Sequence, residues 1–333
     1  MGGKIGRVYG MLRYVLRRLI YMVPMMLVIS VLCFTVIKLQ PGDFGSQYFN
    51  NPRVTPEMVQ QLRENLGLDK PAYIQYLTWM KGIITKGDFG YSFAYKRPVG
   101  ELIWERMAWT VAVAGITIVF TWVVAIPIGI YSATHQYSFA DYFLTFVGFL
   151  GISIPGFFLA LVLMYLVLRM GGTNVGGLFS HEFIGAPWSV PKVIDLFKHI
   201  WVPVVAIGLN GTAGLIRMMR ANLLDVLGTQ YVTTARAKGL TNTTVIYKHA
   251  LRNAINPLIS IFGMQLPELI SGTIISSIVL NLPTMGPFFY DALTNHDQYL
   301  VMTFLMLSAL LMLVGNLIAD ILLAWSDPRI RYE

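Results

Sequence analysis

One acidic residue, Glu268, falls inside a hydrophobic run that covers residues 255–280. A carboxylate at the bilayer centre costs on the order of 2.5–3.5 kcal/mol, so we expect Glu268 to face other helices or a wet cavity. Helical spacing of about 100° per residue places it on one narrow face with Gln265, Gly272 and Ser276. We interpret this face as the wall of a path for a polar solute. The alternative is a contact with a partner subunit, in which Glu268 is protonated or paired.

Catalytic and metal-binding patterns are not found in the sequence. The five histidines lie in loops and at the ends of hydrophobic runs, and none has the H-E-x-x-H spacing of a zinc site: His135, His181, His199, His249 and His296. The glycine-rich Gly171–Gly177 is not followed by Lys-Ser or Lys-Thr, and G-x-x-x-x-G-K-[ST] occurs nowhere. We therefore predict a chain that is not an enzyme, binds no cofactor, and leaves any ATP and magnesium to another subunit.

The composition indicates a membrane protein. Of the 333 residues, 55% are hydrophobic and 13% are charged, whereas soluble domains carry about 25% charged residues. The net charge of +8 could suggest a nucleic-acid partner. However, the basic residues cluster at the ends of hydrophobic runs, as membrane topology requires, so we predict a bilayer and no nucleic acid as the partner. The single cysteine, Cys33, excludes a disulfide within the chain.

Six hydrophobic runs approach or exceed the roughly 20 residues that cross a bilayer. They cover residues 19–39, 110–132, 142–168, 200–217, 255–280 and 301–325. The first follows Arg13, Arg17 and Arg18 and has no cleavage site, so we expect an uncleaved anchor. We predict an all-α integral membrane protein with six transmembrane helices, a long outer loop domain and a short helix in a basic cytoplasmic loop. Its parts are an N-terminal cytoplasmic segment with the first helix (1–38), an extracytoplasmic loop domain (39–109) and a five-helix core (110–333) that includes the basic loop at 218–254.

Basic residues set the expected orientation. The amino-terminal tail and the loop at 218–254 are rich in Lys and Arg, whereas residues 281–300 contain none. Positive charge gathers on the cytoplasmic side of membrane proteins. We therefore expect both termini in the cytoplasm of a prokaryotic cell, with the chain in its inner or plasma membrane.

The outer loop carries helix signals of its own. Thr55 is a cap, Pro56 a first helical residue and Gly67 a terminator. Asp69 and Pro71 start a second helix that ends near Gly87. Each helix should carry an apolar face, listed in order: Val59, Leu62 and Leu66 on the first, and Ile74, Leu77 and Ile84 on the second.

The segment from Tyr231 to Pro257, YVTTARAKGLTNTTVIYKHALRNAINP, is the longest basic stretch between two hydrophobic runs. It predicts a helix from about Thr229 to Lys238 that ends at Gly239, because glycine suits the left-handed position after a helix. The cluster at Thr241–Thr244 should cap a second helix that reaches about Asn253. Helices this short are marginal in water, so they require a surface on which to dock.

TTARAKG followed by HALRNAINP resembles the EAA-type cytoplasmic loop of ABC transporter permeases. The oligopeptide and dipeptide branch is the most similar, through YKHAL, LGLDKP, KGDFGYSF, RPV and the ending SDPRIRYE. The resemblance covers residues 11–333. It implies that the short cytoplasmic helix is a coupling helix within a coupling loop at 218–254. This helix would dock on an ATPase subunit through Thr233, Thr234, Ala235, Arg236, Ala237, Lys238 and Gly239. The family's leading Glu and first Ala are replaced by Thr233 and Thr234, so the resemblance implies no salt bridge from that position.

The resemblance implies the permease subunit of an ABC importer for oligopeptides or related solutes. Its partners would be a second homologous permease, two ATP-binding subunits and an extracellular solute-binding protein. One alternative keeps this architecture and imports oligosaccharides, on which Trp104, Trp109 and Trp201 could stack. The favoured interpretation of these tryptophans is the ordinary aromatic belt at the membrane interface. A more distant one is an ion-coupled secondary transporter, which would show inverted repeats or several intramembrane charges.

Overall fold

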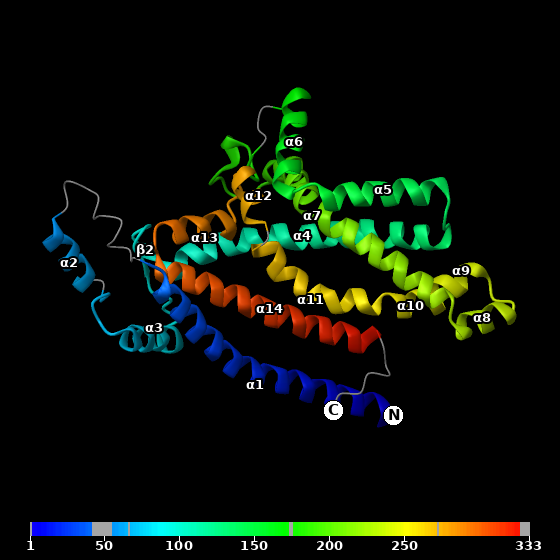
Figure 1. The fold of residues 1–333 in the computed structure, drawn as a ribbon, viewed down its shortest axis with the longest axis horizontal. Helices are drawn as coiled ribbons and strands as arrows, with labels where there is room; N and C mark the ends of the chain where they lie inside the picture. The colour runs from blue at the N-terminus through cyan, green and yellow to red at the C-terminus, as the bar shows by residue number, and fades with distance from the viewer. Residues whose placement is uncertain (1, 42–54, 66, 173–175, 272, 327–333) are drawn as a thin grey trace. The chain divides into compact units, whose positions relative to one another are not determined.

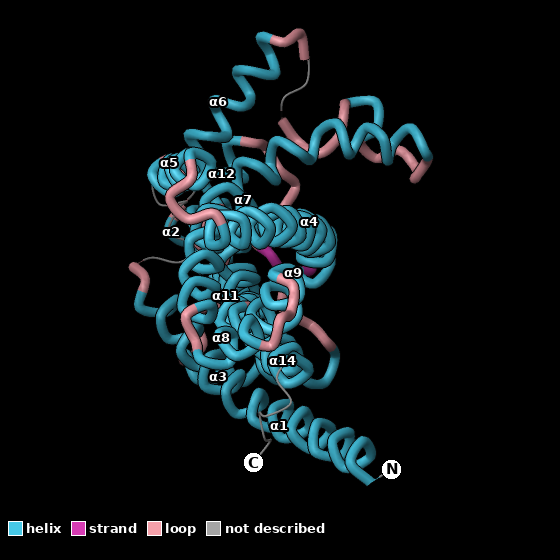
Figure 2. Tube along the Cα trace, turned by 90° about the vertical axis from the view of Figure 1, so that its right-hand side faces the viewer, coloured by secondary structure: helices cyan, strands magenta, loops and turns pink. Residues whose placement is uncertain are grey.

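The computed structural model describes residues 2–41, 55–65, 67–172, 176–271 and 273–326. Helices dominate this part of the chain, and the one sheet is a two-stranded ribbon (Figure 1; Figure 2). The chain forms two compact units. The first comprises residues 1–17, 111–282 and 312–333, and the second comprises residues 18–110 and 283–311. The predicted boundaries at residues 38 and 109 separate parts of the chain by the side of the membrane on which they lie, not by spatial clustering. They therefore stay a prediction.

The first unit is a bundle around a long central helix, α7. Helices α5 and α6 both pack against α7, as do parts of α10, α11 and α12 (Figure 1). The helices that contribute to this unit are α4 (Val99–Thr134), α5 (Phe139–Ser153), α6 (Gly156–Arg169), α7 (Val190–Leu227), α8 (Gln230–Ala237), α9 (Asn242–Thr244), α10 (Leu251–Ala254), α11 (Asn256–Ser271) and α12 (Ile274–Val279). A 3-10 turn, η2 (His181–Phe183), precedes α7, and a π-helix, η3 (Val245–Ala250), lies between α9 and α10.

Within the described residues, four helices are long and apolar enough to cross a membrane: α1 (Gly2–Leu39), α4, α7 and α14 (Gln298–Ser326). Helices α5 and α6 make a fifth span only as a pair, bent by 106°. The bend falls at Pro155, because proline lacks an N–H and disfavours helical geometry at the residue before it; Ile154 is accordingly extended, with ψ 121°. The predicted fifth run is divided between α11 and α12. The described residues thus support four or five spans, and the count of six stays a prediction.

The second unit includes α2 (Pro56–Asn65), α3 (Ala72–Lys86), a ribbon of β1 (Tyr91–Ser92) and β2 (Arg97–Pro98), and α13 (Met285–Thr294). The ribbon is antiparallel, with Tyr91 opposite Pro98. The helix signals predicted for this loop are confirmed. The backbone N–H of Met58 donates to Thr55 Oγ1 over 3.4 Å. Gly67 and Gly87 end their helices at φ +67° and +64°, where a side chain would be strained.

The apolar face predicted for α3 is not the face that the structure buries. Leu77 and Ile84 are 61% and 72% exposed, whereas Gln75 and Trp79 are buried. The Trp79 indole N–H donates to the backbone oxygen of Phe89 over 3.0 Å, and its ring packs with Phe34 and Met302. These contacts of Trp79 determine which face of α3 is buried. The side chains of Val59, Leu62 and Leu66 lie outside the described residues.

Candidate functional site

A cavity of about 290 Å³ lies in the first unit, where α4, α6, α7, α11 and α12 meet. Two of the four predicted path residues line it, Gln265 on α11 and Ser276 on α12. Glu268 lies on α11, but its side chain and the whole of Gly272 fall outside the described residues. The described lining is entirely uncharged: Ile118, Thr121, Gly156, Phe157, Ala206, Ile207, Gly208, Asn210, Gly211, Gln265, Thr273, Ile275 and Ser276.

Gln265 is held in place by an indole. Trp122 Nε1 on α4 donates to Gln265 Oε1 over 3.0 Å, and the Trp122 ring meets the edge of Phe262, with 5.8 Å between centroids. The bond fixes the direction of the amide, whose NH₂ can donate toward the cavity and whose oxygen keeps a second lone pair that can accept.

Ser276 reaches the cavity because α6 and α12 approach closely. A Cβ atom at Gly156 would lie 3.2 Å from Ser276 Oγ and 3.3 Å from the backbone oxygen of Ala206. A larger residue at the start of α6 would therefore push α12 and α7 away. The Pro155-Gly156 pair thus both bends the chain and lets the serine hydroxyl sit at the cavity wall.

Sequence reasoning missed Asn210, which also lines the cavity. It lies near the middle of α7 and is exposed, and it has no hydrogen bond to any of the described residues. An amide in the middle of a spanning helix is expensive unless it meets water or another polar group. The signal was available, since Asn210 is the only amide or acid in the run 200–217.

The threonines were missed for a different reason. Thr121 and Thr273 line the cavity. Thr121 Oγ1 donates to the backbone oxygen of Gly208 over 3.4 Å, an oxygen that also accepts from Thr212 Oγ1, outside the lining, over 2.8 Å. Threonine hydroxyls commonly bond within helices, so their sequence alone does not mark a cavity. The result is a wall that offers amides and hydroxyls and no described charge.

The second candidate site is the basic segment around α8. The helix predicted from about Thr229 to Lys238 forms as α8, with Thr229 just before it, and Gly239 follows at φ +76°, as predicted. Six of the seven coupling residues are exposed: Thr233, Thr234, Arg236, Ala237, Lys238 and Gly239. The exception is Ala235, which is 7% exposed and packs inward with Val232. Ala235 therefore holds α8 on the bundle rather than facing a partner.

The second predicted helix forms, but its winding changes part-way. The backbone N–H of Thr244 donates to Thr241 Oγ1 over 3.4 Å, which confirms the predicted cap. The chain then widens into the π-helix η3 before α10 completes the segment. Val245 and Ala250 are fully buried there, and Asn253 Nδ2 donates to the Tyr231 hydroxyl of the neighbouring helix over 2.8 Å. Propensity does not signal a π-turn, so the sequence could not indicate it.

Metal binding finds no support in the part of the chain that the structure describes, since no three His, Cys, Asp or Glu side chains gather there. The polar groups of both sites suit hydrogen bonding and docking.

The profile of the binding-protein-dependent transport system inner membrane component matches residues 125–332, and the profile for the N-terminal part of such components matches residues 11–114. The chain belongs to this family. It is therefore a permease subunit of an ABC transport system, a multi-pass inner membrane protein rather than an enzyme, and ATP is bound by separate subunits of such systems.

Curated relatives of this permease match it along nearly their whole length. The oligopeptide transport system permease protein AppB of Bacillus subtilis (strain 168) is 37% identical, over 97% of this chain and 100% of its own. The dipeptide transport system permease protein DppB of Escherichia coli (strain K12) is 33% identical over the same shares.

Among solved structures, the permease resembles one titled as inward-facing conformations of the MetNI methionine ABC transporter. The TM-score is 0.50 at 18% identity, over 68% of this chain and 96% of that one. At this identity the likeness shows a shared fold.

Proposed function

We propose that this permease imports oligopeptides through the cavity lined by Gln265, Asn210 and Ser276. The names of the relatives support a peptide cargo, because AppB and DppB are oligopeptide and dipeptide permeases. The chemistry of the wall carries the proposal further. Uncharged amides and hydroxyls can bond to the repeating amide groups of a peptide whatever its side chains are.

Glu268 and Gly272 belong to the same proposed path on sequence grounds. Glu268 lies one helical turn from Gln265, and residues three apart share a helix face. A carboxylate there would attract the amino terminus of a peptide. Oligosaccharides, the alternative cargo, would find hydroxyl partners in the cavity but would give this carboxylate no cationic partner.

The exposed residues of α8, with Lys238 and Gly239 after it, are the proposed contact with an ATPase subunit. Closure of the ATPase dimer on ATP would push this segment, and the bundle would alternate its access. The proposed assembly contains this chain, a second homologous permease, two ATP-binding subunits that hold ATP and Mg²⁺, and an extracellular solute-binding protein. Both termini and the loop at 218–254 would be cytoplasmic, with residues 39–109 outside.

The decisive test measures uptake by the complete complex reconstituted in proteoliposomes, with labelled oligopeptides and oligosaccharides as competing cargoes. Asn210→Leu and Glu268→Gln should each lower peptide uptake about threefold to tenfold, the value of one hydrogen bond. Asn316→Leu is the matched control, because this amide lies on α14 and does not line the cavity.

Two results would contradict the proposal. Equal uptake by Asn210→Leu, Glu268→Gln and the control would remove the cavity from the path. Uptake of oligosaccharides in preference to peptides would leave the path in place and change its cargo. Glu268→Leu distinguishes a path residue from a lipid-facing one. If Glu268 merely faced lipid, the variant protein would be more stable than wild type and would keep its uptake.

A further inference from the structure

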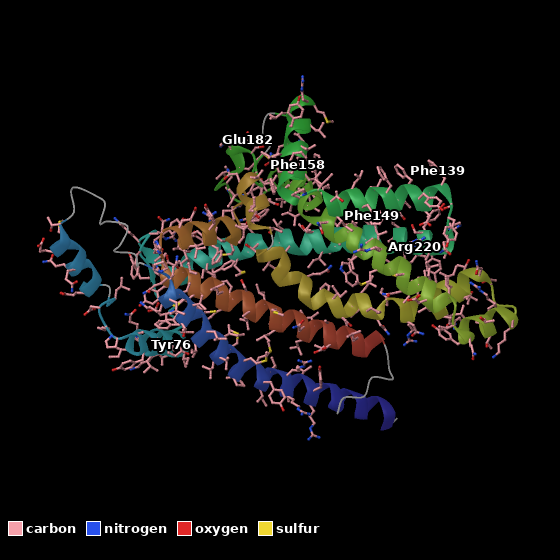
Figure 3. All side chains as sticks on the ribbon, viewed as in Figure 1. Tyr76, Phe139, Phe149, Phe158, Glu182 and Arg220 are labelled. Carbon is pink, nitrogen blue, oxygen red and sulfur yellow. The ribbon has the colours of Figure 1, made fainter. Side chains whose placement is uncertain are left out.

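A second hollow, of about 190 Å³, lies between α5 and α7. Its walls are mainly apolar, with Ile152 and Ala213 toward one end. Two guanidinium groups, Arg217 and Arg220, line it toward the other end, where Arg220 meets Asp141 near the start of α5. Figure 3 labels Phe149 and Arg220, which line this groove from the two helices. From Ala213 to Arg220 the groove follows the helix for about 10 Å.

The charge in this groove is not balanced. Arg220 is neutralised by Asp141, with Nη2 2.9 Å from Oδ2. Arg217 is exposed and has no ion pair or hydrogen bond among the residues that the structure describes. One unpaired positive charge therefore lies at one end of an apolar groove, and the described lining contains no acid to match it.

The position of Arg217 along α7 corresponds to the depth of lipid headgroups. Residues 200–216 contain no charge, and Arg217 is the first charged residue after them. Seventeen helical residues extend about 26 Å, close to the roughly 30 Å of a bilayer's hydrocarbon core. A basic side chain at that boundary meets phosphate groups, and the groove beyond it meets acyl chains.

We propose that this groove binds one anionic phospholipid. Its phosphate pairs with Arg217, and an acyl chain lies along the apolar wall toward Ile152. A free phosphate ion would use the charge but leave the wall empty, and a neutral lipid would use the wall but leave Arg217 unpaired. Gly148 marks the floor, because a Cβ atom there would meet nothing within 4 Å.

The experiment uses the complete complex, stripped of native lipid in detergent and titrated with phosphatidylglycerol or phosphatidylcholine while bound lipid is counted by native mass spectrometry. Phosphatidylglycerol should bind more tightly. Arg217→Gln should weaken its binding about fivefold. Gly148→Leu should displace the acyl chain by filling open space, so that binding of both lipids at this site falls. Lys198→Gln is the control, because it removes a positive charge from the same helix outside the groove.

Three outcomes would overturn the proposal. The first is that wild type binds phosphatidylglycerol and phosphatidylcholine equally tightly, or that Arg217→Gln and Gly148→Leu bind phosphatidylglycerol as tightly as wild type does. The second is full displacement of phosphatidylglycerol by glycerol phosphate, which would show a simple anion site. The third is an efficient cross-link from Phe149→Cys, in a Cys33→Ala background, to another subunit of the complex, which would show that protein covers the groove.

Discussion

Arg220 clamps Asp141 with two parallel hydrogen bonds, from Nε to Oδ1 over 3.0 Å and from Nη2 to Oδ2 over 2.9 Å. The carboxylate also accepts the backbone N–H of Tyr137 over 3.0 Å. The pair joins the turn between α4 and α5 to α7, residues that lie far apart in the sequence. The Asp141 side chain is only 3% exposed, so it depends on this partner for its charge.

Loss of that partner should destabilise the subunit. Arg220→Met leaves a buried carboxylate without its cation, and we expect a loss of about 2–3 kcal/mol in the free energy of unfolding, less than for a fully buried pair because Arg220 is 28% exposed. Thermal unfolding of the purified complex measures it. The double variant Asp141→Leu, Arg220→Met should recover part of the loss. Equal melting temperatures for wild type and Arg220→Met would refute the clamp.

Asp297 should make the stability of the second unit depend on pH. It is fully buried just before α14 and accepts hydrogen bonds from Ser92 Oγ over 2.6 Å and from the Ala94 N–H over 3.1 Å. Burial raises the pKa of Asp297 above its usual value, more than these bonds lower it. The folded state therefore holds a proton that the unfolded state releases.

The sign follows from that difference in bound protons. The contribution of Asp297 to stability is fully present below its unfolded-state pKa of about 3.9 and is lost as pH rises through its higher pKa in the folded state. Melting temperatures measured from acid to neutral pH should show this fall in wild type and a flatter profile in Asp297→Asn, which cannot ionise. Parallel profiles for the two proteins would count against it.

Gly239→Val should uncouple ATP hydrolysis from transport. Gly239 has φ +76°, a conformation that strains a β-branched residue, so the chain after α8 would shift at the proposed ATPase contact. We expect the ATPase activity of the complex to lose its stimulation by cargo while the subunit still inserts. Gly87→Val is the matched control, since Gly87 also has positive φ, +64°, and open space around it, but lies after α3. Equal coupling in both variants would remove α8 from the contact.

The proposed orientation predicts which residues an impermeant thiol reagent reaches. In a Cys33→Ala background, a cysteine replacing Thr294 should react in intact cells. One replacing Thr241 should react only after the membrane is opened. Both positions are exposed in the structure, so unequal labelling would reflect the side of the membrane. Labelling of Thr241→Cys in intact cells would reverse the orientation.

Local signals in the sequence predicted local structure well. Thr55, Gly67, Thr241 and Gly239 each act within one helical turn, and each stands where the caps and stops were expected. Hydropathy also indicated the long spans, because a segment that contacts lipid must be apolar and must satisfy its backbone hydrogen bonds within the helix.

Features that depend on distant neighbours were missed. Pro155 explains why the chain bends at that point, but the size of the bend, 106°, and the packing of α6 beside α12 depend on residues distant in the sequence. The buried side of α3 follows from Trp79 and its partners in α1 and α14. Asn210 is the opposite case, since a single amide within an apolar run is visible in the sequence and marks a polar position on the helix. Only the fold reveals that two amides, Asn210 and Gln265, line one cavity.

The apolar core beneath α8 has a consequence for how the subunit opens. Val232 of α8, Val245 and Ala250 of η3, and Leu258 of α11 are all fully buried in one cluster. Close-packed interiors do not let one member slip while the others stay. The amides of α8, η3 and the first turns of α11 should therefore exchange their hydrogens as one cooperative unit, with a common free energy of opening. The first turns of α11, the helix that carries Gln265, would then move together with α8, the proposed contact with the ATPase subunit.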